Sequence, residues 1–193
     1  MTVRRKMYHM ATPALIAIVG FAACDGRESS PLATPVEAGS AHASHDVVNT
    51  PEVRRWLAGL RQATVAYKDY DAAAPAGWDE PILPCMELEG EGGMGQHYID
   101  GEAMAELTPQ EFAPELLVYE PQKNGRNRLV AVEYAVPMAL WGAEPPVLHG
   151  VEFHRNEALG LWVLHAWIWK NNPEGMFADW NPTVNCDYAP AED

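Results

Sequence analysis

Apolar residues recur at helical spacing directly after a strong helix start. Thr50 offers a hydroxyl N-cap, Pro51 suits the first helical position, and Glu52 places an acid in the first turn. The apolar stripe consists of Val53, Trp56, Leu57, Leu60, Thr64 and Tyr67. These signals predict an amphipathic helix that starts at Pro51, runs on to Ala74 and packs one face against another layer of the domain.

Strand-like runs dominate the rest of the chain. They cover residues 96–99, 115–119, 129–136, 147–154 and 161–169, and the Asn124-Gly125 pair predicts a hairpin turn between the second run and the third. A helix followed by such a meander predicts an α+β domain, with the N-terminal helix on a curved, mainly antiparallel sheet of about four to five strands.

The start of the chain has the pattern of an export signal, so it is not expected to be part of the folded domain. A basic beginning precedes a short apolar run, which ends in small residues and Cys24. The pattern resembles a bacterial lipoprotein signal, which implies cleavage after residue 23 and lipid on Cys24. The alternative is an ordinary secretory signal in which Cys24 is incidental. Asp25 favours retention at the inner membrane in the lipoproteins that the signal resembles.

Composition and net charge indicate which kinds of partner the chain can bind. Residues 24–49 are rich in Ser, Ala, Pro and Gly, which predicts a flexible tether between the lipidated cysteine and one globular domain at residues 50–193. The formal net charge of the chain is −14, and removal of the basic signal makes it more negative. Such acidity argues against nucleic acid as a partner. The membrane is expected to be a partner through the lipid on Cys24.

Two cysteines remain once Cys24 is assigned to lipid. Cys85 and Cys186 lie far apart without a CxxC motif, which is typical of a structural disulfide in an exported protein rather than of a redox site. No thiol is then left to act as a nucleophile, and the GxSxG motif of serine hydrolases is absent from the sequence.

Four polar residues lie inside or beside the apolar strands and carry the chemistry of this sequence: His97, Glu133, His154 and His165. A buried carboxylate needs a partner, and histidine is a natural one. These groups can hold a divalent metal (Zn or Cu, with His97, His154 and His165 as candidate ligands), line a small-ligand pocket or merely hydrogen-bond within a core. The sequence leaves these three alternatives open.

Several strings resemble an uncharacterised family of exported bacterial proteins. They are GMGQHYID, PELLVYEP, VAVEYAVP and LHAWIWKNNPEGMFADWNPTVNC. The resemblance brings no known activity, but it implies that Asn172 and Asn181 belong to one constellation with His97, Glu133 and His165. Ile99-Asp100 stands where the family pattern has Val-Asn.

Two functions follow as hypotheses. The first is a membrane-tethered periplasmic lipoprotein that binds a small ligand or divalent metal in a pocket lined by the constellation and Trp167. The second is an enzyme, a hydrolase, lyase or isomerase, that uses Glu133 or His165 as a general base.

Overall fold

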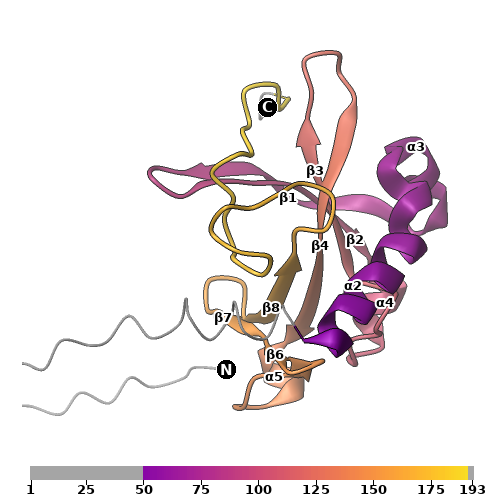
Figure 1. Cartoon of the computed structure of the whole chain (residues 1–193), viewed down its shortest axis with the longest axis vertical. Coiled ribbons are helices and arrows are strands. Elements are labelled where there is room, and N and C mark those ends of the chain that lie inside the picture. The colour runs from indigo at the N-terminus through magenta and orange to yellow at the C-terminus, as the bar shows by residue number, and fades with distance from the viewer. Residues whose placement is uncertain (1–49, 191–193) are drawn as a thin grey trace, which may run out of the picture. The chain divides into compact units, whose positions relative to one another are not determined.

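The computed structural model describes residues 50–190 (Figure 1). The predicted lipid site Cys24, the signal and the tether lie outside the described residues. Within residues 50–190, no helix is both long enough and apolar enough to cross a membrane. The elements are α2 (Pro51–Thr64), η1 (Val65–Lys68), α3 (Tyr70–Ala73), η2 (Ala74–Ala76), β1 (Trp78–Leu88), β2 (Gly92–Asp100), α4 (Gly101–Ala105), β3 (Leu116–Pro121), β4 (Asn127–Pro137), α5 (Met138–Trp141), β5 (Val147–Leu148), β6 (Val151–Glu152), β7 (His154–Asn156) and β8 (Leu161–Ala166).

Helix α2 begins as predicted but ends ten residues earlier than Ala74. The Thr50 hydroxyl accepts the Val53 N–H at 3.2 Å, which satisfies one of the unpaired donors of the first turn. The helix breaks because Asp69 adopts extended backbone angles and forms a β-bridge with Arg128 of β4. A 3-10 turn and the short helix α3 therefore replace the last predicted turns.

The sheet confirms the α+β class. Its six strands lie in the order β1-β2-β3-β4-β8-β7, and all five neighbouring pairs are antiparallel. Strand β1 is absent from the predicted strand-like runs, and its Pro81 and Pro84 are residues that strand interiors usually exclude. Both prolines fit because β1 is an edge strand with several register shifts, where a missing backbone N–H is tolerated.

The predicted strand at residues 147–154 is wrong as a single element. His149 and Gly150 have positive φ angles of 52° and 81°, so the chain reverses between β5 and β6 in a two-residue hairpin. A separate short strand, β7, then pairs with β8 at the sheet edge. The alternating pattern of these residues did not reveal the turn because a histidine rarely adopts such angles.

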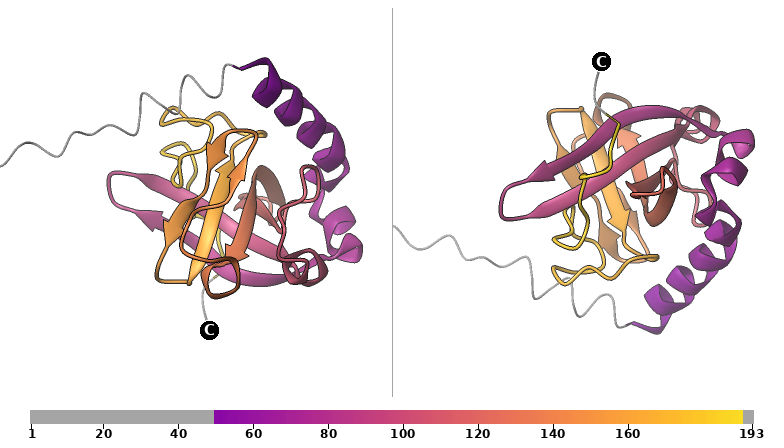
Figure 2. Two further views of the ribbon diagram at one scale, coloured as in Figure 1. Left: turned by 90° about the horizontal axis from the view of Figure 1, so that it is seen from below. Right: turned by 90° about the horizontal axis from the view of Figure 1, so that it is seen from above.

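Helix α2 covers one face of the sheet, while the β1–β2 hairpin reaches past β8 as the sheet curls (Figure 2). Val53, Trp56 and Leu60 of α2 pack there with apolar side chains of β3, β4 and β8 in one continuous cluster. The opposite face carries two smaller clusters, one around Trp167 and Val184 and one around Leu116, Ala135 and Val163. The polar candidate residues lie on this second face.

Side chains alternate between the two faces of the sheet along β8, but this alternation does not extend to Leu129 and Trp169. His165 and Val163 lie on the face opposite the helix, as alternation predicts. Strict alternation along β4 would place Leu129 on the face of Glu133, but a bulge between Leu129 and Ala131 turns it to the helix side. Alternation continued past β8 would place Trp169 beside His165, but β8 ends at Ala166 and the Trp169 ring reaches Thr64 of α2.

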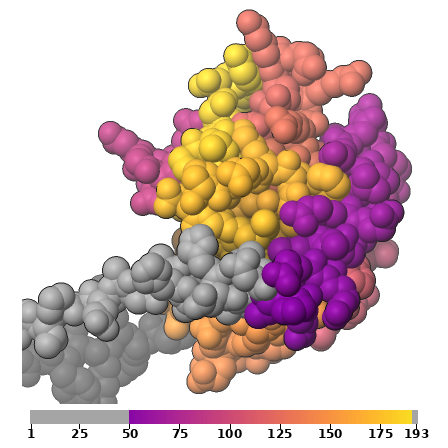
Figure 3. Space-filling view, viewed as in Figure 1, coloured from indigo at the N-terminus to yellow at the C-terminus, as the bar shows by residue number. Residues whose placement is uncertain are grey.

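The C-terminal segment folds back over the sheet, and Figure 3 shows it between α2 and the β1–β2 hairpin. A disulfide between Cys85 and Cys186, with a Cα–Cα distance of 5.6 Å, confirms the predicted pairing. The segment also exchanges two backbone hydrogen bonds between Asn181 and Gly93. A Cβ on Gly92 would lie 2.3 Å from the Cα atom of Pro182, so this close backbone approach requires glycine.

Candidate functional site

His97, Glu133 and His165 meet on the sheet face opposite α2, although they come from three different strands. Glu133 of β4 and His165 of β8 are direct cross-strand partners. His97 lies on β2, and β3 separates it from β4. The Nε2 atom of His97 lies 3.3 Å from Oε2 of Glu133, and the Nε2 atom of His165 lies 3.7 Å from Oε1. One carboxylate therefore faces two imidazoles.

All three side chains are buried. His97 is 0% exposed, His165 is 1% exposed and Glu133 is 5% exposed. Despite the short distances to Glu133, the Nε2 atoms of both histidines lack a hydrogen bond of good geometry within the described chain. Buried polar atoms in proteins nearly always have such a partner, so unpaired atoms at one point need an explanation.

The second nitrogen of His97 is held by the backbone. Its Nδ1 atom lies 3.1 Å from the carbonyl oxygen of Gly95, which fits a donated N–H. This contact assigns the proton to Nδ1 and leaves the Nε2 lone pair directed at Glu133. Burial, together with the neighbouring charge of His165, lowers the pKa of His97 to about 3. His97 is therefore a neutral imidazole with a free nitrogen.

The second nitrogen of His165 faces a carboxylate. Its Nδ1 atom lies 3.5 Å from Oδ1 of Asp179, and the same oxygen lies 2.8 Å from Nδ1 of His154. Burial alone would lower the pKa of His165, but the charges of Glu133 and Asp179 raise it above its usual value. Burial raises the pKa of Glu133, and attraction to His165 opposes this shift only in part.

This arrangement can hold a metal ion. One donor atom from each of His97, Glu133 and His165 lies within 4.8 Å of the other two. A tetrahedral ion with bonds of about 2.1 Å places its ligands about 3.4 Å apart. The two observed His–Glu distances, 3.3 Å and 3.7 Å, bracket that spacing. Two imidazoles and one carboxylate also suit Zn²⁺ or Cu²⁺ by donor type, and His165 would release its Nε2 proton on binding the ion.

The other predicted site residues lie nearby in different roles. His154 contacts Asp179 rather than Glu133, and 43% of its side chain is exposed. Trp167 stacks on His165 with ring centroids 6.0 Å apart. The side chains of Asn172 and Asn181 hydrogen-bond to the backbone of the C-terminal loop, through the carbonyls of Trp180 and Asn171. Both amides therefore shape the loop.

Asp179 was missed by sequence reasoning. It lies in a loop that has no strand or helix periodicity, so no pattern assigned it a face. Burial would raise the pKa of Asp179, but its contacts with His154 and His165 hold that pKa well below its usual range. The only available signal was an isolated acid in the Trp-rich segment between Phe177 and Asn181.

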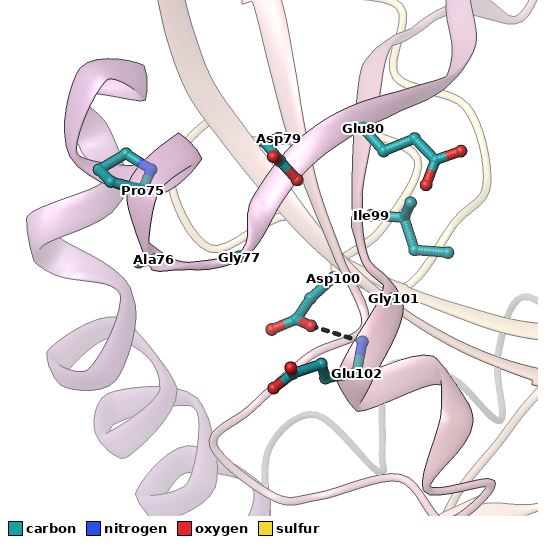
Figure 4. A pocket seen from close by; sticks show the side chains of 9 residues that line it. All are labelled: Pro75, Ala76, Gly77, Asp79, Glu80, Ile99, Asp100, Gly101 and Glu102. Atoms are coloured by element: carbon teal, nitrogen blue, oxygen red, sulfur yellow. Dashed lines mark hydrogen bonds between the residues drawn. The ribbon is translucent and has the colours of Figure 1, made fainter.

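A surface pocket of about 510 Å³ lies elsewhere, between η2 and the start of α4. Figure 4 shows Asp79, Asp100 and Glu102 gathered around it, with the Asp100 carboxylate hydrogen-bonded to the Glu102 N–H. All the charged side chains that line it are acids, and neither a histidine nor a nucleophile is among them. We therefore place the functional site at the three buried strand residues and not at this pocket.

No family model matches the chain, and neither a curated protein nor a solved structure matches it. The resemblance to an exported bacterial family thus stays a prediction.

Proposed function

We propose that this protein binds a divalent transition metal ion, Zn²⁺ or Cu²⁺, through His97, Glu133 and His165. The observation that carries the proposal is the convergence of two buried, unpaired Nε2 atoms on one buried carboxylate. A divalent cation would supply the missing partner of both nitrogens and offset the negative charge of Glu133. No rearrangement of the strands is needed to bring the donors together.

Metal content of the purified full-length protein tests the proposal. After exposure to Zn²⁺ and removal of excess by gel filtration, elemental analysis is expected to find one tightly held ion per chain. His97→Gln and Glu133→Gln are expected to abolish retention, since each removes one of three ligands. His149→Gln is the matched control, because His149 pairs with Glu52 and Glu111 away from the site. Equal retention by the wild type and both site variants would refute the proposed site.

We also propose that the protein acts in the cell envelope as a lipoprotein anchored through Cys24. The Cys85–Cys186 disulfide supports export, because such bonds persist mainly in oxidising compartments. A Cys24→Ser variant is expected to move from the membrane fraction to the soluble fraction of cells. Recovery of that variant in the membrane fraction would contradict lipid anchoring at this residue.

An enzymatic role is the second candidate, and the raised pKa of Glu133 is the observation that favours it. General bases and acids gain efficiency when burial moves their pKa toward neutrality. The two functions differ in what Glu133 faces: a bound cation occupies its oxygens in the first, whereas a substrate proton must reach them in the second. An activity that survives thorough chelation would favour the enzyme.

A further inference from the structure

The C-terminal loop brings one acidic side chain to the rim of the proposed metal site. Asp179 lies beside His165, with 3.5 Å between its Oδ1 atom and the Nδ1 atom of the histidine. That Nδ1 atom is buried, and within residues 50–190 it has no hydrogen bond of good geometry. The Asp179 oxygen is at present closer to Nδ1 of His154, at 2.8 Å.

Metal binding by His165 would change what its Nδ1 atom requires. An imidazole that ligates through Nε2 is neutral and carries its proton on Nδ1, so a buried N–H then needs an acceptor. His97 already has one in the Gly95 carbonyl. For His165 the facing acceptor is the Asp179 carboxylate. The two candidate ligands thus differ: the backbone orients one and a side chain orients the other.

The loop around Asp179 is held on both sides. The Trp167 indole N–H donates to the Ala178 carbonyl at 2.6 Å, directly before Asp179. The Asn172 amide donates to the Trp180 carbonyl at 2.8 Å, directly after it. Because both neighbours are fixed by buried side chains, the aspartate stays at the rim of the site without being part of the sheet.

We propose that Asp179 is a positioning residue of the metal site: it accepts the Nδ1–H of His165 and thereby directs Nε2 at the metal. This inference rests on the proposed metal function. His154 holds the outer side of the same carboxylate and is not itself a ligand. Carboxylates that orient a metal-bound histidine in this way typically contribute about 10–100-fold to metal affinity.

The test compares Asp179→Asn with Asp187→Asn in the full-length protein, using Co²⁺ and Zn²⁺ as probes. Asp187 lies in the same segment and is exposed, so both variants lose one negative charge. We expect Asp179→Asn to lower the affinity for both ions by about 10–100-fold and to change the d–d absorption bands of bound Co²⁺. Asp187→Asn is expected to leave both properties unchanged. The unfolding temperature of metal-free Asp179→Asn is measured alongside and should fall somewhat, because the lowered pKa of Asp179 means that its ionised carboxylate stabilises the folded chain.

Two further variants separate positioning from simple folding effects. Asp179→Glu keeps the charged acceptor and should recover part of the affinity and the wild-type Co²⁺ spectrum. His154→Gln should retain wild-type affinity, and a loss as large as that of Asp179→Asn would overturn the assignment of roles.

The outcomes are distinguishable from failure of the metal site itself. Wild-type affinity and an unchanged spectrum in Asp179→Asn would refute the role of Asp179 alone. Absence of Co²⁺ and Zn²⁺ binding by the wild-type protein would refute the metal site, and the positioning role with it.

Discussion

On the helix side of the sheet, buried hydroxyl and indole groups donate hydrogen bonds to nearby oxygen atoms. The Tyr119 and Tyr134 hydroxyls donate to the carbonyls of Tyr67 and Glu111 at 2.6 Å and 2.7 Å, and the Trp56 indole also donates to Glu111. On the opposite side, His97 and His165 are as deeply buried, yet their Nε2 atoms converge unpaired on Glu133. Within residues 50–190, the helix side also holds one unpaired nitrogen, Nε2 of His149, which lies 3.2 Å from Oε1 of the exposed Glu111. The opposite face differs because two such nitrogens converge on one buried carboxylate.

The two faces differ in whether their buried polar groups add to the stability of the fold. Each unsatisfied buried polar group costs about 1–3 kcal/mol, so a chain optimised only for folding would replace the three residues with apolar ones. The helix face shows that this sequence satisfies buried polar groups where it can. Buried unpaired groups that converge are therefore best explained by a ligand, and the predictions below test each face in turn.

The largest effect is expected on the helix face. Trp56→Ala should lower the free energy of unfolding by about 3–5 kcal/mol, because it removes a side chain that is 1% exposed in the main cluster. Trp141→Ala is the matched control, since that ring is 42% exposed on α5. Urea denaturation measures both, with and without Zn²⁺. A loss in Trp56→Ala as small as that of the control would contradict the description of this face.

The second largest effect is expected from the disulfide, which holds the C-terminal segment to the sheet. Replacing Cys85 and Cys186 together by serine should reduce stability by about 2–5 kcal/mol, since the bond closes a long loop. Thermal unfolding of the variant beside the oxidised wild type measures this loss. Alkylation of both cysteines in unreduced, unfolded wild-type protein would show that the bond is absent.

Stability is expected to depend on pH through Glu115, whose buried carboxylate accepts the Ala135 N–H of β4. Burial raises the pKa of Glu115 to about 7, and hydrogen bonds from its own N–H and from Ala135 oppose this rise only in part. The folded chain then binds this proton more tightly than the unfolded chain, so stability falls as pH rises from about 4.5 to about 7. Glu115→Gln should remove about 1–3 kcal/mol of that decline. Denaturation across this pH window checks the prediction, with the exposed Glu144→Gln as control. Identical slopes in the wild type and Glu115→Gln would contradict it.

The smallest effect is expected for Glu133→Gln in chelator. Its carboxylate is buried and destabilised in the metal-free protein, and the raised pKa of Glu133 reflects this. A neutral amide of similar size should therefore change the free energy of unfolding by about 1 kcal/mol or less. Zn²⁺ should raise the unfolding temperature of the wild type and leave this variant unchanged. A severe loss of stability without metal would mean that Glu133 is needed for folding, as the groups of the helix face are.

The sequence was informative wherever local chemistry decides structure. The Thr50 cap, the Asn124-Gly125 hairpin and the Cys85–Cys186 pair were all predicted and are confirmed. Each depends on residues whose conformational preference or chemistry is nearly independent of the rest of the fold.

Features decided by distant contacts were harder to predict. The extended backbone at Asp69 depends on pairing with Arg128, and the bulge beside Ala131 depends on β3. Alternation within β8 indicated the face of His165, and the histidines were grouped with Glu133 from their strand positions. Asp179 could not be found, because only the folded loop brings it to His165.

Anomalous diffraction at the zinc edge, on crystals of the protein grown with Zn²⁺, is the decisive measurement for a metal site at these residues. One strong peak is expected about 2.0–2.2 Å from Nε2 of His97, Nε2 of His165 and an oxygen of Glu133. No peak among these three residues, or a peak only beside the acidic pocket of Asp79 and Glu102, would contradict it.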